Sequence, residues 1–209
     1  MKIAVVCANG KAGSLIVKEA VGRGLDVTAV VRGENRSAAA KAISKDLMDL
    51  GKDDLAGFDV VIDAFGAWTP DTLGQHSTTL AHLCDILAGT KTRLLVVGGA
   101  GSLYLDKSHT ACLYDAPNFP DGYKPLAAAQ AKALGELRTR ADVNWTYVSP
   151  AADFRADGVR TGKYTLAGEE FTMNSKGESI LSYADYAVAM VDLAVGGGHV
   201  RERVSVVGE

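Results

Sequence analysis

The chain has 209 residues, of which 47% are hydrophobic and 22% are charged, and its formal net charge is −3. This length allows one well-buried core but is short for two full domains, and no apolar run approaches the roughly 20 residues of a membrane helix. The small negative charge gives no general attraction to nucleic acids or anionic membranes, so we expect neither as a partner.

The three cysteines, Cys7, Cys84 and Cys112, are odd in number, and none lies in a CxxC or CxxH spacing. This argues against a disulfide framework or a structural zinc site and fits a reducing compartment. The sequence enters a predicted strand directly after Met1, and no signal peptide is visible. We therefore expect a cytoplasmic protein.

Short apolar runs rich in β-branched residues alternate with helical patterns over the first two thirds of the chain. Runs without polar alternation are typical of strands buried on both faces of a parallel sheet. Such alternation predicts βαβ units and an α/β fold, a Rossmann-like doubly wound parallel sheet. The predicted strands lie at 3–6, 27–31, 60–62, 94–97 and 145–148, and the helical patterns follow residue 13 and span 73–87 and 126–141.

Residues 151–209 have a different pattern. The stretch 154–171 is rich in glycine and charge and predicts a hairpin or loops. Ser182 and Asp185 resemble a capping box, with Asp185 in the place usual for Glu; the helical pattern that follows ends at glycines 196–198, and 204–207 predicts a last strand. This region lacks a core of its own, so we expect one domain, 1–209, with 151–209 forming a small lobe that covers the substrate.

A glycine-containing turn, Cys-Ala-Asn-Gly-Lys-Ala-Gly at residues 7–13, stands between the first predicted strand and helix. Glycines there let the backbone approach a phosphate, and a helix N-terminus offers unpaired N–H groups and the positive end of its dipole. A tight turn without a ligand is the alternative, but the strand–turn–helix context favours a dinucleotide. The predicted cofactor contacts in the turn are Asn9, Gly10, Lys11, Ala12 and Gly13.

Two arginines follow the second predicted strand, where a dinucleotide site meets the adenosine ribose. An acidic residue there accepts a hydrogen bond from the 2′-OH of NAD, whereas an arginine pairs with the 2′-phosphate of NADP. Arg32 directly follows the strand and favours NADPH over NADH; Arg36 is either a second phosphate contact or a solvated charge. Asp46 lies between the predicted strands at 27–31 and 60–62, where a further strand would end. It either accepts from the adenine amino group or caps the next turn, and Leu47 is a further predicted contact.

Small residues follow the later strands and would let a cofactor pass close to the backbone. A glycine-rich turn is the alternative at 98–99, and Asp63 is expected to be a structural group at a strand end. The nicotinamide would lie at 149–151 if the first turn holds the pyrophosphate. The predicted cofactor contacts at these strand ends are Ala64, Phe65, Gly66, Gly98, Gly99, Ser149, Pro150 and Ala151.

Aromatic residues gather in the loops expected at the same edge of the sheet, where they either stack on a planar substrate or pack internally. They are Trp68, Tyr104, Tyr114, Phe119, Tyr123 and Phe154. The histidines are scattered and predict no metal site; most are expected to be solvated surface groups. They are His76, His82, His109 and His199.

Motifs over nearly the whole length support a family assignment. They are KIAVV at 2–6, NGKAGS at 9–14, VTAVVR at 27–32, LLVVGGAGSL at 94–103, YKP at 123–125, VSPAA at 148–152, RTGKY at 160–164 and SYADYA at 182–187. As a set they resemble an atypical short-chain dehydrogenase/reductase, closest to the NADH-flavin reductase group related to biliverdin-IXβ reductase. The resemblance implies a Rossmann-like sheet that binds NAD(P)H and reduces a flavin- or quinone-like acceptor.

Two departures from the family pattern bear on chemistry. Cys7 stands where the turn normally begins with glycine, which restricts its backbone. Ala127, four residues after Tyr123, replaces the lysine of the Tyr-x-x-x-Lys pair that lowers the pKa of a proton-donating tyrosine. Alcohol–ketone chemistry is therefore disfavoured, whereas hydride transfer between stacked rings needs chiefly orientation and exclusion of water. Tyr123 remains the only candidate acid.

Two other functions compete with a reductase. An NADP-binding, redox-sensing regulatory protein without turnover is compatible with the missing lysine. A nucleotide-sugar epimerase is disfavoured because the C-terminal lobe is short. The acceptor itself and the oligomeric state do not follow from the sequence.

Overall fold

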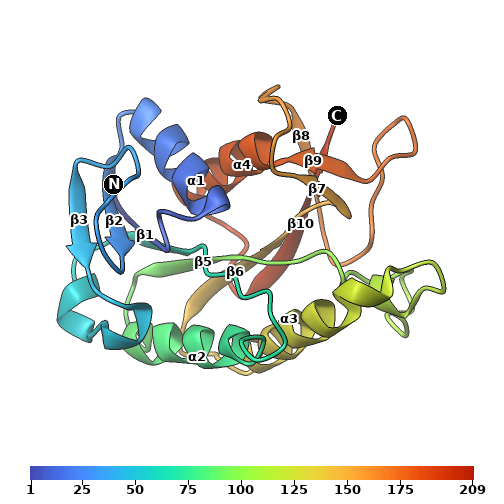
Figure 1. Cartoon of the computed structure of the whole chain (residues 1–209), viewed down its shortest axis with the longest axis horizontal. Coiled ribbons are helices and arrows are strands. Elements are labelled where there is room, and N and C mark those ends of the chain that lie inside the picture. The colour runs from blue at the N-terminus through green and yellow to red at the C-terminus, as the bar shows by residue number, and fades with distance from the viewer.

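The computed structural model describes residues 1–209, and its centre is an eight-stranded sheet of order β3-β2-β1-β4-β5-β6-β10-β8 (Figure 1). All neighbours pair in parallel except β8, which runs antiparallel to β10 at one edge. The strands are β1 (Lys2–Val6), β2 (Asp26–Val31), β3 (Lys41–Ser44), β4 (Val60–Asp63), β5 (Arg93–Val97), β6 (Asn144–Ser149), β8 (Tyr164–Ala167) and β10 (Glu202–Gly208).

The strand order reverses beside β1. The chain runs outward through β2 and β3, then returns so that β4 pairs on the other side of β1. Val6 at the end of β1 is opposite Val30 on one side and Asp63 on the other. Ligands of doubly wound sheets bind at such a switch point, outside the carboxyl ends of the strands.

Two helices cover each face of the sheet (Figure 1). Helices α1 (Lys11–Gly22) and α4 (Tyr183–Gly196) enclose one hydrophobic cluster of 26 buried residues, and α2 (Gln75–Leu87) and α3 (Lys124–Leu137) enclose another of 20. Tyr186 is fully buried in the first cluster and its hydroxyl donates to the carbonyl oxygen of Val148, 2.7 Å away. None of these helices combines the length and the hydropathy needed to cross a bilayer.

The structure confirms the predicted α/β fold, and each predicted strand lies inside an observed one. The reason is that these strands are buried on both faces, which gives unalternating apolar runs. The third strand ends at Ser44, and Leu47 begins a short 3₁₀ turn, Leu47–Asp49.

The hairpin predicted within 154–171 is wrong. Residues of β8 pair with β10, whereas β7 (Asp153–Arg155) pairs in parallel with β9 (Ile180–Ser182). Helix α4 and strand β10 also belong to the main sheet and its helical layer, so the extra C-terminal region is smaller than 151–209. Such short strands owe their pairing to distant partners, which local pattern does not reveal.

The capping box at α4 is only half formed. The Ser182 hydroxyl accepts from the Asp185 amide at 2.9 Å, as predicted. The buried Asp185 carboxylate does not reach back to Ser182; it accepts from the Thr161 and Gly162 amides at 2.8 and 2.7 Å and from the Thr161 hydroxyl at 2.8 Å. Asp185 therefore fastens the 155–163 loop to α4.

Candidate functional site

The turn between β1 and α1 leaves backbone donors free. Gly10 precedes the helix in an extended conformation, with φ −70° and ψ 165°, and no side chain caps the helix. The Ser14 amide donates to Gly10, whereas the amides of Lys11, Ala12 and Gly13 have no acceptor in the protein. No acidic residue lies in the first turn, so this helix N-terminus can take an anionic group.

Glycine is required in this turn for steric reasons. A Cβ on Gly13 would lie 2.5 Å from the Cys7 carbonyl oxygen and 3.1 Å from the Cα of Ala8. A Cβ on Gly10 would lie 3.2 Å from the same oxygen. The turn thus packs helix against strand as closely as a dinucleotide-binding turn requires, and the residues present fit a pyrophosphate.

Cys7 adopts a left-handed backbone conformation, with φ 58°. This region costs little for glycine but is strained for other residues. Burial, together with the nearby Asp63 carboxylate, raises the pKa of the Cys7 thiol to about 12. The thiol is therefore protonated at neutral pH and a poor nucleophile.

Asn9 ties the turn to the loop after β2. Its side-chain amide donates to the Glu34 carbonyl oxygen at 2.9 Å, and its oxygen accepts from the Arg36 amide at 2.8 Å. These bonds occupy the Asn9 side chain, so its role is to hold the two loops together. The Arg36 backbone is thereby held beside the turn at residues 7–13, and the Arg36 side chain is exposed.

Arg32 lies at the carboxyl end of β2 with 85% of its side chain exposed. Its Nε atom is 4.0 Å from Oδ2 of Asp46, and Oδ1 of Asp46 accepts from the Met48 amide at 2.9 Å. Asp46 therefore caps the turn that follows β3, which was one of its two alternatives; the adenine contact stays a prediction. The side chain of Leu47 is buried in the core.

The end of β4 carries an unpaired buried carboxyl group. Asp63 is 4% exposed, and its Oδ1 accepts from the Phe65 amide at 3.0 Å, the structural role expected. Burial raises the pKa of Asp63 to about 6. The Phe65 ring packs edge-on against His76, whose Nε2 lies 3.1 Å from the Ala67 carbonyl oxygen. His76 is buried and is thus an exception to the expectation that most of the histidines are solvated.

The glycines after β5 are needed by the protein's own side chains. A Cβ on Gly98 would overlap the Tyr147 ring, and one on Gly99 would overlap the Gln130 amide. The Tyr147 hydroxyl also accepts from the Gly99 amide at 3.4 Å. Sequence reasoning missed Tyr147 and Gln130, because nothing in their local sequence shows that they meet this strand end.

The end of β6 is closed to solvent. Ser149 is fully buried and its hydroxyl has no hydrogen-bond partner, while Pro150 and Ala151 are also buried. Contact between their side chains and a cofactor would need local movement. Their proposed place beside the nicotinamide stays a prediction, as does every other cofactor contact predicted above.

Tyr123 precedes α3 with 59% of its surface exposed. The lysine position of the Tyr-x-x-x-Lys pair is filled by Ala127, which is buried against Gly101; a Cβ on that glycine would lie 2.5 Å from the Ala127 Cβ. Trp68, in the loop after β4, is 67% exposed.

The other aromatic residues predicted for this edge, Tyr104, Tyr114, Phe119 and Phe154, are half-buried. Tyr104 stacks on His109 with 4.2 Å between ring centroids, and Phe154 stacks on Tyr183 at 3.9 Å. Burial and the neighbouring Tyr123 raise the pKa of Tyr183. Trp68 and Tyr123 are thus the exposed aromatic surfaces at the carboxyl edge of the sheet.

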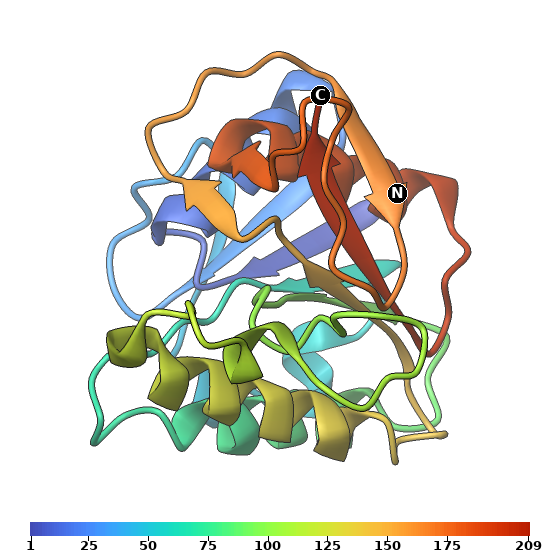
Figure 2. The same cartoon turned by 90° about the vertical axis from the view of Figure 1, so that its right-hand side faces the viewer.

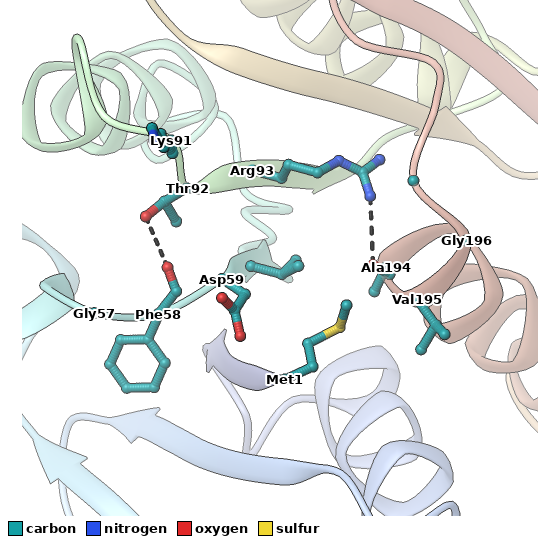
Figure 3. Close-up of a pocket in the computed structure, with 12 residues that line it drawn as sticks. Met1, Gly57, Phe58, Asp59, Lys91, Thr92, Arg93, Ala194, Val195 and Gly196 are labelled. Carbon is teal, nitrogen blue, oxygen red and sulfur yellow. Dashed lines mark hydrogen bonds between the residues drawn. The ribbon is translucent and has the colours of Figure 1, made fainter.

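A separate pocket of about 430 Å³ lies at the opposite edge, where β1, β4 and β5 begin (Figure 3). Arg93 crosses it and donates from Nη1 to the Leu193 carbonyl oxygen at 2.7 Å and from Nη2 to that of Gly198 at 3.0 Å. These bonds satisfy carbonyl groups at and just beyond the end of α4. The pocket lies far from the strand ends where ligands of this fold bind.

The switch point, the parallel strand ends and the free helix N-terminus define an NAD(P)-binding Rossmann-like protein of the short-chain dehydrogenase/reductase type. A model of the NAD(P)H-binding family matches residues 7–194. The chain belongs to this family of NAD(P)H-binding oxidoreductases.

Three relatives illustrate the membership. A protein described as a putative NADH-flavin reductase from Streptococcus pneumoniae is 58% identical, with a TM-score of 0.98 and full coverage of both chains. The uncharacterized protein YwnB of Bacillus subtilis is 43% identical over 100% of this chain and 99% of its own length. A protein described as a putative epimerase from Bacteroides thetaiotaomicron is 33% identical, with a TM-score of 0.83 and coverage of 99% and 96%.

Proposed function

We propose that this protein is an NADPH-dependent reductase that transfers a hydride to a planar flavin- or quinone-like acceptor. The observation that carries the proposal is the turn before α1, with three free amides, beside the exposed guanidinium of Arg32. A helix N-terminus suits the pyrophosphate and a guanidinium suits the 2′-phosphate. The relative described as a putative NADH-flavin reductase supports the acceptor class.

The proposed class of acceptor is supported by the missing lysine of the Tyr-x-x-x-Lys pair. Ala127, which is buried against Gly101, fills the position of the lysine in the Tyr-x-x-x-Lys pair, so the site lacks that partner for Tyr123. Carbonyl reduction needs such an acid, whereas a flavin or quinone can take its proton from water. The exposed rings of Trp68 and Tyr123 offer apolar faces to a planar molecule.

In this mechanism the chain binds the cofactor, orients the cofactor and the acceptor, and excludes water from between them. The amides of Lys11, Ala12 and Gly13 hold the pyrophosphate, and Arg32 pairs with the 2′-phosphate. When bound, the reduced nicotinamide supplies the hydride: NADPH becomes NADP⁺, and the acceptor gains one hydride and one proton. Tyr123 is the one hydroxyl that we propose to test as donor of that proton. We infer that residues 1–209 act as one domain, with part of 151–209 covering the acceptor.

The experiment is NADPH and NADH oxidation by the purified protein with a panel of flavins, quinones and small aldehydes. We expect flavins or quinones to support turnover, with NADPH preferred, and NADPH deuterated at the transferred C4 position to react more slowly through a primary kinetic isotope effect. Tyr123→Phe separates a proton donor from a stacking ring, because it keeps the ring and removes only the hydroxyl. Failure to bind NADPH, or turnover with aldehydes alone, would contradict the proposal.

A regulatory protein that senses the NADP redox state is the other candidate, favoured by Ala127 in place of the lysine of the Tyr-x-x-x-Lys pair. It predicts comparable affinity for NADP⁺ and NADPH, no turnover with any acceptor, and a specific protein partner recovered by pull-down. The same panel of measurements therefore decides between the two functions.

A further inference from the structure

Arg203, in β10, carries a fully buried guanidinium. In the sequence it lies well after the last predicted cofactor contact, Ala151. The Arg203 side chain has 0% exposure. Nη1 donates to the Ser102 carbonyl oxygen at 2.8 Å and to the Ser102 hydroxyl at 3.1 Å. Nη2 donates to the Glu169 carbonyl oxygen at 2.9 Å and pairs with the Glu169 carboxylate. One side chain thus joins the loop after β5 to the segment after β8.

Glu169 extends this contact to a third part of the chain. Its carboxylate also accepts from Nη2 of Arg138, just past the end of α3, at 2.7 Å. The Tyr104 amide donates to the Glu169 carbonyl oxygen at 2.9 Å, and the Tyr104 ring lies 5.4 Å from the Arg203 guanidinium carbon. A buried cation is stable only when paired and hydrogen-bonded in this way.

The loop that these residues hold, residues 101–115, directly follows the strand end at Gly98 and Gly99. Figure 2 shows this yellow-green loop meeting the orange segment between β8 and β9 in front of the sheet. Within the loop, the Leu113 amide donates to Leu103 at 2.8 Å and the Tyr114 amide to Gly101 at 2.9 Å. The loop therefore has internal order. It is held to the segment after β8 by backbone hydrogen bonds of Tyr104 with Glu169 and Phe171, and by Arg203 through Ser102 and Glu169.

We propose that Arg203 is a positioning residue: through Ser102 and Glu169 it fixes residues 101–115 beside the carboxyl end of β5, where the proposed acceptor would bind. This inference rests on the proposed function, but the position of the loop is measurable without turnover. The Arg203 side chain is fully buried among protein groups, so it would act through the loop and not by contact with a ligand. Its effect is on where the loop stands relative to the end of β5.

Arg93 provides a matched control. It is also an arginine that donates to backbone carbonyl oxygens, those of Leu193 and Gly198, and its Nε, like that of Arg203, has no partner. It lies at the opposite edge of the sheet (Figure 3). Arg93→Met should therefore cost stability while leaving the 101–115 loop unchanged.

The experiment compares Arg203→Met, Arg203→Lys and Arg93→Met by amide hydrogen exchange, NADPH affinity and steady-state kinetics with riboflavin. For Arg203→Met we expect exchange of the Leu113 and Tyr114 amides to accelerate about tenfold or more, because local opening becomes easier. The KM for riboflavin should rise about tenfold, with the Kd for NADPH within about twofold. Lysine should recover part of both effects, since it keeps the charge but not the fork.

Each outcome decides the proposal. Unchanged exchange in the loop overturns it, as does an equal rise in KM for Arg93→Met at matched stability. If Arg203→Met does not fold, Glu169→Gln tests the same contact, because it weakens the ion pair and preserves shape; unchanged exchange there also overturns it. If no acceptor is reduced by the native protein, the proposed function fails, and the exchange data alone decide the role of Arg203.

Discussion

The two halves of the carboxyl edge are built by different means. Around the turn before α1, the backbone defines the surface: free amides, a close helix–strand contact and an exposed arginine. Around the loop after β5, charged side chains are paired with one another and with backbone groups, as Arg203 and Arg138 are with Glu169. Electrostatic attraction for a ligand is therefore concentrated on the first side, whereas the second offers shape and aromatic faces.

Gly13→Ala disrupts the turn before α1 and has the largest expected effect. The new Cβ would lie 2.5 Å from the Cys7 carbonyl oxygen, so α1 or β1 must shift. We expect a loss of about 3 kcal/mol in the free energy of unfolding and at least a roughly tenfold weaker Kd for NADPH. Chemical denaturation and fluorescence titration measure both quantities.

Gly22→Ala is the control for that substitution. Gly22 ends the same helix, and a Cβ there meets nothing within 4 Å. Alanine should leave stability unchanged or slightly raised, because glycine is the poorer helix former. An equal loss of stability in Gly22→Ala would show that the loss in Gly13→Ala does not come from the contact with Cys7.

Asp63→Asn tests a buried carboxyl group that has no ion pair, whereas Glu169 beside the loop after β5 is paired with Arg138 and Arg203. Its pKa is raised from 3.8 to about 6 by burial, which corresponds to a cost of about 3 kcal/mol above pH 6 as an upper bound. Asparagine keeps an acceptor for the Phe65 amide and removes the charge. We expect it to raise the free energy of unfolding at neutral pH.

The sign of the pKa shift determines the pH dependence of this gain. Below pH 3.8 the Asp63 carboxyl is protonated in both the folded and the unfolded state, so its ionisation costs the native protein nothing there. As the pH rises towards 6, the unfolded state ionises first, and the native protein loses stability that the Asp63→Asn variant retains. Urea denaturation of both proteins between about pH 4 and about pH 7.5 measures the growing difference; a difference that is constant over this range would contradict the prediction.

Arg32→Ala tests where the attraction for the cofactor resides. If the guanidinium pairs with the 2′-phosphate, its removal should weaken NADPH by about 2 kcal/mol, roughly 30-fold, with little change for NADH. Isothermal titration with both dinucleotides measures the difference. Arg36→Ala, in the same loop, should have a smaller effect; equal losses for NADPH and NADH in Arg32→Ala would exclude a 2′-phosphate contact.

The sequence was most informative where structure is local. The strands and the turn at 7–13 follow from apolar runs and glycine spacing, because neighbours in the chain determine them. The contacts around the loop after β5 were not predictable, because Arg203 meets Ser102 across 101 residues and Arg138 meets Glu169 across 31. The sequence predicts small residues at 98 and 99 to admit a cofactor, but it does not show that Tyr147 and Gln130 also leave no room for a side chain there.

Cys7→Gly, in the same turn before α1, has the smallest expected effect. Cys7 has φ 58°, a conformation in which glycine is unstrained and other residues are destabilised by about 1 kcal/mol. The thiol also packs against the core on the α2 side, so its loss offsets part of that gain. Cys7→Ala removes the thiol at the same φ, and the difference between the two variants isolates the backbone. We expect glycine to be about 1 kcal/mol more stable than alanine in thermal or urea unfolding, with NADPH affinity no weaker than native. Equal stability of the two variants would show that the turn tolerates a side chain at this position without strain.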